Sequence, residues 1–174
     1  MAVLSLVTVA CGSTPTPALP SQSSPPHGLC ALADLATTAG RLQGAGGQIV
    51  GFLVLANSSD RPCALLGFPE LEIAADGVVV GEPRQASEAP RPVLLPALGP
   101  PPMAEGARRG QATVRFLFGN WCRPQPPAEL VIKLGLPESS ERATLRAPLV
   151  SPPRCDDPGA PPSLSVWPFE VVEP

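Results

Sequence analysis

The chain has 174 residues, of which 44% are apolar and 16% charged, with a net charge of −3 and 26 prolines. This length suits one domain with an appendage, and the apolar content excludes a wholly disordered chain. The many prolines and glycines argue against long helices and favour short strands joined by turns, while the acidic balance gives no reason to expect nucleic acid, which would need a basic face.

The first ten residues have features of a secretory leader. Residues 2–10 are uncharged and almost entirely apolar, but far too few to cross a bilayer, which needs ~20 residues. The small residue Ala10 is followed directly by Cys11, and the segment Thr-Val-Ala-Cys at residues 8–11 resembles the lipobox of bacterial lipoproteins. In that family the cysteine thiol takes a diacylglyceryl group and the leader is cleaved before it.

Two further points bear on this interpretation. No Lys or Arg precedes the apolar run, so we expect that residues 1–10 are a signal peptide truncated at its N-terminus and that the true start codon lies upstream. The alternative for the same residues is a buried strand with an incidental cysteine at Cys11.

Residues 11–28 are predicted to be the lipidated Cys11 and a disordered tether. The stretch after the cysteine is rich in Pro, Ser and Thr, and it has no charge and no hydrophobic periodicity. Partly in the polyproline II conformation, it would hold a domain up to ~50 Å from the membrane surface. The only histidine, His27, lies at its end and is expected to be a solvated linker residue.

Four more cysteines follow, namely Cys30, Cys63, Cys122 and Cys155. An even number in an exported chain predicts disulfides, and three pairings are possible. We favour Cys30–Cys63 and Cys122–Cys155, because each pair joins neighbours in the sequence, and each loop would contribute ~3–4 kcal/mol. A zinc site is not expected, because no Cys-x-x-Cys pair exists and the only histidine is in the tether.

The remaining chain has the pattern of short strands. Residues 48–57 are apolar on both faces, which predicts a central strand covered on both sides. Residues 71–80 predict a hairpin around Asp76-Gly77, a dipeptide that favours a type I′ turn. Residues 112–118 alternate as in a half-buried strand. Further elements are expected at residues 63–67, 93–95, 130–134, 143–147 and 164–172, with Pro168 at an edge or bulge, a proline-rich loop at 99–110 and a helical turn at 31–36.

Together these elements predict an all-β domain over residues 29–174. We expect an Ig-like antiparallel β-sandwich of about seven or eight short strands with two disulfides.

Several of these segments also resemble one family, the domain-of-unknown-function family 4232 of exported and lipoprotein-like proteins of high-GC bacteria. The segments are Cys30, Gly-Ala-Gly-Gly at 44–47, Asn-Ser-Ser-Asp-Arg-Pro-Cys at 57–63, Leu-Leu-Gly-Phe-Pro at 65–69, Asn-Trp-Cys at 120–122, and Cys155. The resemblance covers about residues 30–172 and is most specific over 44–69. It implies a small Ig-like β-sandwich in the cell envelope and brings no catalytic residues.

Candidate chemistry is sparse. A Ser-His-Asp site is unavailable, because the only histidine lies in the tether. Glu70 and Glu72 share one side of a predicted strand, which is more typical of an exposed face than of an acid–base pair. Asp156 and Asp157 could ligate Ca²⁺ weakly, but calcium prefers six or more oxygens and a solvated turn is favoured. We therefore expect no enzyme, no cofactor and no metal.

Four residues are candidates for partner contact or core packing. Trp121 beside Cys122, and Trp167, are expected to pack in the core as a tryptophan does against the disulfide of Ig-type sandwiches, although either could be an exposed contact residue. Arg108 and Arg109 could meet an anionic polymer or lipid headgroup, or simply keep a loop soluble.

The sequence thus predicts a monomeric, non-catalytic binding or interaction module, anchored by the lipid on Cys11 to the extracytoplasmic face of the bacterial cell membrane. Its partner would be an envelope protein or glycan. The alternative is an envelope hydrolase or a weak metal-binding protein that uses carboxylates.

Overall fold

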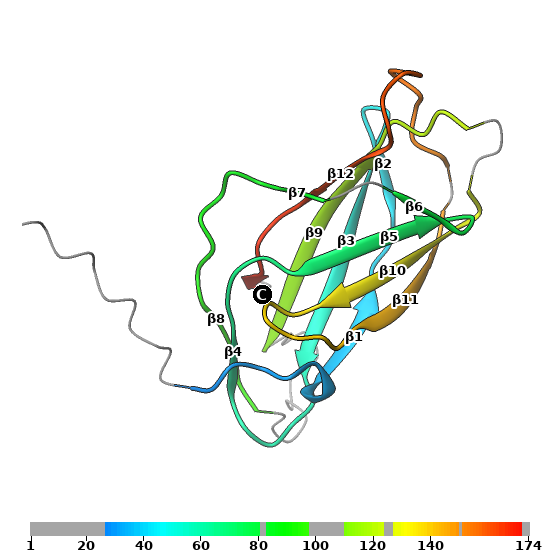
Figure 1. Ribbon diagram of the computed structural model, residues 1–174. Coiled ribbons are helices and arrows are strands. Elements are labelled where there is room, and N and C mark those ends of the chain that lie inside the picture. Colours follow the sequence, from blue (N-terminus) through cyan, green and yellow to red (C-terminus); the bar gives the residue numbers. More distant parts are fainter. Residues whose placement is uncertain (1–26, 81–82, 98–109, 124–126, 150, 172–174) are drawn as a thin grey trace, which may run out of the picture.

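A computed structural model describes residues 27–80, 83–97, 110–123, 127–149 and 151–171 (Figure 1). The predicted leader, Cys11, nearly all of the predicted tether, and Arg108 and Arg109 lie outside the described residues. In the described ranges, no helix has the length and apolar character that crossing a membrane would require.

The regular secondary structure of the described residues consists of β-strands and one 3-10 helix, η1 (Leu32–Asp34). The strands are β1 (Leu35–Ala39), β2 (Gln43–Ala45), β3 (Gln48–Asn57), β4 (Cys63–Leu65), β5 (Glu70–Ala75), β6 (Val78–Val80), β7 (Arg84–Gln85), β8 (Val93–Leu95), β9 (Gln111–Gly119), β10 (Glu129–Gly135), β11 (Ala143–Pro148), β12 (Ser163–Val166) and β13 (Glu170–Val171).

These strands form two main sheets and a ribbon, which confirms the all-β, sandwich-like architecture. The larger sheet follows the order β1-β3-β9-β12-β7, with β2 paired to β3 and β13 paired to β9. The smaller sheet has the order β11-β10-β5-β6, and β4 pairs with β8 alone. Figure 1 shows the strands of the smaller sheet crossing those of the larger one.

Two details of the predicted sandwich are wrong. The described residues contain thirteen strands instead of seven or eight. The additional ones include the short strands β2, β7 and β13, which have little hydrophobic pattern of their own and pair with β3, β12 and β9. The sheet is also not purely antiparallel, since β7 runs parallel to β12. The helical turn expected at residues 31–36 is limited to η1, and the chain then pairs with β3 as strand β1.

The centre of the molecule is the antiparallel pair of β3 and β9. The register places Leu53 opposite Val114 and Leu55 opposite Ala112, and all four side chains are buried. Strand β3 is central, as predicted, but its two faces differ. Alternate residues from Ile49 onward are buried, whereas those between them are only half-buried, so the expectation that β3 is covered on both sides is wrong.

The hairpin of β5 and β6 forms at the predicted dipeptide. Ala75 pairs with Val78 across the turn, and Asp76 and Gly77 have φ values of 49° and 77°. Positive φ at both central residues is the property of a type I′ turn, which suits the twist of the flanking strands. The chain also breaks at Pro168, between β12 and β13, as its missing N–H group predicts.

Candidate functional site

Both disulfides have the predicted pairing, Cys30–Cys63 and Cys122–Cys155. Each closes a loop with a sequence separation of 33 residues. Cys30 and Cys63 are buried and join the start of the domain to β4. Cys155 is exposed, and its bond joins the segment after β9 to the segment before β12. The two covalent links therefore act on different parts of the sandwich.

Trp121 lies in the core beside the second disulfide. Its ring is 4% exposed and meets the Phe118 ring edge-on, with centroids 5.9 Å apart at 77°. The Arg123 guanidinium lies 5.5 Å from the indole centroid. This placement agrees with the packing interpretation, and it leaves little of the indole surface for a partner.

Trp167 belongs instead to a polar cluster on the surface. Its indole N–H donates to Glu88 Oε1 at 3.0 Å, and the Arg115 guanidinium stacks 4.2 Å from the ring centroid. Arg115 also forms an ion pair with Glu88 at 3.4 Å. The expectation that Trp167 packs in the core is therefore wrong, because its polar edge is used by a carboxylate from a segment 79 residues away.

The aspartates after Cys155 hold a loop around Asn120. The backbone N–H groups of Asp156 and Asp157 both donate to Asn120 Oδ1, at 3.1 and 2.9 Å. The Asp157 carboxylate accepts the backbone N–H of Gly159 at 2.9 Å. Over the described ranges, no group of three or more His, Cys, Asp or Glu side chains is placed to hold a metal ion. The loop is thus an exposed turn that is ordered by hydrogen bonds to the Asn120 and Asp157 side chains.

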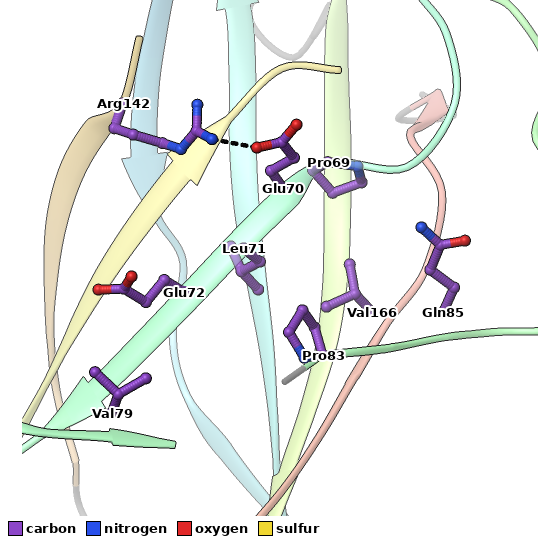
Figure 2. A pocket seen from close by; sticks show the side chains of 9 residues that line it. All are labelled: Pro69, Glu70, Leu71, Glu72, Val79, Pro83, Gln85, Arg142 and Val166. Atoms are coloured by element: carbon purple, nitrogen blue, oxygen red, sulfur yellow. Dashed lines mark hydrogen bonds and ion pairs between the residues drawn. The ribbon is translucent and has the colours of Figure 1, made fainter. Parts of the chain in front are cut away.

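A largely apolar hollow lies between the two sheets, where strands β5 and β6 approach β7 and β12 (Figure 2). We call it the β5–β12 groove. Its volume is about 520 Å³, and the buried side chains of Leu71 and Val166 form its inner wall. It is lined by Pro69, Glu70, Leu71, Glu72, Val79, Pro83, Gln85, Arg142 and Val166.

Both candidate carboxylates lie at this groove, and both are neutralised by cations. Figure 2 shows Glu70 paired with Arg142 at the rim. Glu72 pairs with Lys133 of β10 at 2.7 Å. Both glutamates point to the exposed side of β5, as their two-residue spacing predicts. The groove therefore offers an apolar wall with two ion pairs at its edge. No local pattern in the sequence indicates this groove, because segments that are far apart in the chain form it.

Comparison with known proteins finds one similarity, in the first half of the domain. No curated protein matches the chain. Residues 30–100 match the model of the family described as "Domain of unknown function (DUF4232)". The matched segment contains the first disulfide and strands β1 to β8, including the β5 side of the groove. Over residues 30–100 the chain is therefore similar to the DUF4232 family, which is the family that its cysteine and glycine motifs resemble.

Proposed function

We propose that this protein is a lipid-anchored extracytoplasmic protein whose β-domain is a non-catalytic binding module of the cell envelope. The observation that supports an extracytoplasmic location is the pair of disulfides, because such bonds persist in oxidising compartments and are rare in the cytosol. The anchor is Cys11, which follows a small residue and an apolar run as in a lipobox.

The β5–β12 groove is the proposed binding site. Ligand sites are concave and mostly apolar, with a few polar groups that fix orientation, and their volumes are ~300–1,000 Å³. The groove has this character, since Leu71, Val79 and Val166 supply apolar surface and the Glu70–Arg142 pair supplies charge.

The composition of the groove favours a protein partner over a glycan. Its described lining contains no aromatic side chain on which a sugar ring could stack. The proline and aliphatic residues suit instead an extended apolar segment of an envelope protein, with a charged side chain next to Glu70 or Arg142.

Peptide mapping by mass spectrometry of protein from the host's membrane fraction tests the compartment. We expect the Cys11 peptide to carry a diacylglyceryl mass and the other four cysteines to be linked as in the structure. An unmodified Cys11 together with free thiols would overturn the proposal.

Groove-directed crosslinking in the host tests the binding role. Val79 lines the groove and is 57% exposed, so a photoreactive amino acid there should capture an envelope protein. Capture should fall sharply when Arg142→Glu is added. The matched control is Val171, which is 58% exposed and does not line this groove. Equal capture from both positions would reject the groove as the site.

A further inference from the structure

A second apolar surface lies on the small ribbon where the described chain begins. The backbone N–H of Cys30 donates to Ala64 O, and the N–H of Ala64 donates to Gly28 O, both at 3.0 Å. These bonds place Leu29 beside Ala64, and Ala64 is directly opposite Leu94 of β8. Figure 1 shows this first described segment, in blue, running beside β4. Residues in register on neighbouring strands point to the same face.

The large apolar side chains on the two faces of this ribbon differ in exposure. On the inner face Cys63, Leu65 and Leu95 are 7%, 2% and 1% exposed. On the outer face Leu29 is 57% and Leu94 is 51% exposed, whereas the small Ala64 between them is 3% exposed.

Leu66 extends the outer face and is 38% exposed. We call Leu29, Leu66 and Leu94 the ribbon leucines. They make up three of the five large apolar side chains found exposed within the described ranges. Apolar side chains gathered on one small surface indicate an interaction site more strongly than scattered ones.

The surface is hollowed as well as apolar. A shallow depression of about 250 Å³ lies beside Leu29 and Leu66, and Leu136 and Pro137 form its other side. The Cys30–Cys63 disulfide joins the segment that carries Leu29 to β4. The ribbon leucines are thus presented by a covalently fixed surface.

The chain that leads from Cys11 enters the described domain beside Leu29. Leu29 is separated from Cys11 by the seventeen residues 12–28. Because an extended chain spans at most ~3.3–3.6 Å per residue, Leu29 cannot lie more than about 60 Å from Cys11. We infer that the ribbon leucines rest on the lipid bilayer that holds Cys11, an inference that depends on the lipid anchor proposed above.

The size of the surface argues for lipid over a protein partner. Three partly exposed leucines present much less area than the ~800 Å² per partner that a stable protein interface buries. A bilayer contact needs no such area, because the anchor makes it intramolecular and raises the effective concentration.

This contact would orient the domain. The C-terminal end of β3 leads to β4, and β9 begins at that end, opposite Ala56. Strand β9 then runs antiparallel to β3 and reaches Ile49, near the other end of β3. The loops joined by Cys122–Cys155 follow the far end of β9. With the ribbon leucines on the lipid, those loops face away from the membrane.

Hydroxyl-radical footprinting of the full chain on vesicles tests the inference. Cys11 is the only cysteine outside the two disulfides, so it can be coupled to a maleimide-bearing lipid and held on vesicles of phosphatidylcholine and phosphatidylglycerol. Oxidation of the ribbon leucines should fall several-fold relative to the uncoupled Cys11→Ser chain in solution. Val79 and Val171, which are 57% and 58% exposed, are matched controls and should keep their oxidation rates.

A second variant separates contact from mere proximity. Leu29→Ser with Leu94→Ser removes the apolar contact at exposed positions, so Leu66 should regain its solution oxidation rate although the anchor is unchanged. Equal oxidation of the leucines on vesicles and in solution would overturn the inference. Protection that appears without lipid and rises with protein concentration would also overturn it, because a second copy would then cover the surface.

Chemical coupling keeps this test independent of the proposed function. Failure of the host to lipidate Cys11 would be seen by mass spectrometry of the native protein, whatever the footprinting shows. Failure of the leucines to be protected on vesicles would reject the bilayer contact alone.

Discussion

Gly51 of β3 and Phe116 of β9 lie directly opposite each other, and the Phe116 ring occupies the space where a side chain of residue 51 would begin. Phe116 is fully buried, so its ring has no room to move outward. The glycine is therefore required at the centre of the larger sheet because a neighbouring aromatic ring covers it.

Replacement of Gly51 tests this relationship. Gly51→Ala should lower the free energy of unfolding by about 1–3 kcal/mol, as overpacking of a close-packed core does. Adding Phe116→Leu should recover part of that loss relative to the sum of the two single changes. Urea unfolding measures all variants, and Gly28→Ala is the control, because no atom lies within 4 Å of the added carbon. Wild-type stability for Gly51→Ala would contradict the packing described here.

Asn120 is predicted to hold the loop that follows Cys155. Its side-chain N–H groups lie 2.9 Å from Asp157 O, 3.0 Å from Ala160 O and 3.2 Å from Pro161 O, and its oxygen accepts the two N–H bonds described above. Asn120 has φ 55°, so Asn120→Gly keeps the backbone conformation and removes only the side chain. We expect a loss of about 2 kcal/mol in urea unfolding and faster hydrogen exchange at Asp157. Unchanged exchange there would show that the disulfide alone orders the loop.

The two disulfides should differ in their rate of reduction. Cys30 and Cys63 are both 7% exposed, whereas Cys155 is exposed. Because thiol–disulfide exchange requires access to a sulfur atom, Cys122–Cys155 should react first with dithiothreitol. Timed alkylation and mass spectrometry measure the order in which the two disulfides are reduced. A faster reduction of Cys30–Cys63 would mean that its surroundings open more readily than their burial indicates.

Loss of either disulfide should also reduce stability. Each loop has a sequence separation of 33, so paired Cys→Ser changes should each cost about 3–4 kcal/mol on the loop-entropy model.

The ion pair of Glu72 and Lys133 should contribute little to stability. The two groups are 2.7 Å apart, but both side chains are nearly half exposed. Exposed pairs of this kind contribute ~0.2–1 kcal/mol, and salt screens them. Glu72→Gln should therefore change the free energy of unfolding by less than about 1 kcal/mol, and the difference should vanish in high salt. A large loss that persists in salt would point to a role for Glu72 beyond the surface pair.

Much of the strand content was predictable because its signals are local. The alternation of apolar and polar residues marks residues 112–118, and Asp76-Gly77 marks the hairpin turn, without reference to the rest of the chain. The cysteine pairing was also predictable, since the favoured partners are close in the sequence.

The short strands and the surface clusters were not predictable from such signals. Strand β7 has only two residues, too few for a hydrophobic pattern. Its parallel pairing with β12 depends on tertiary packing, which brings residues 84–85 next to residues 165–166. Likewise Trp167 was expected in the core, but Glu88 and Arg115 approach it from other strands and loops. Nothing near Trp167 in the sequence encodes those neighbours.

The sequence by itself determined the strand-forming segments and the pairing of the four cysteines. It also determined that Glu70 and Glu72 lie on one face of β5. Each of these follows from backbone geometry or from cysteine chemistry within a short stretch of chain. Tertiary structure alone decided which faces remain exposed. Leu65 is buried and Leu66 is exposed although both are leucines, and Val166 lines the β5–β12 groove only because β5 and β6 approach it. The physical reason is that burial depends on which distant segments cover a residue, and that depends on how the whole chain packs.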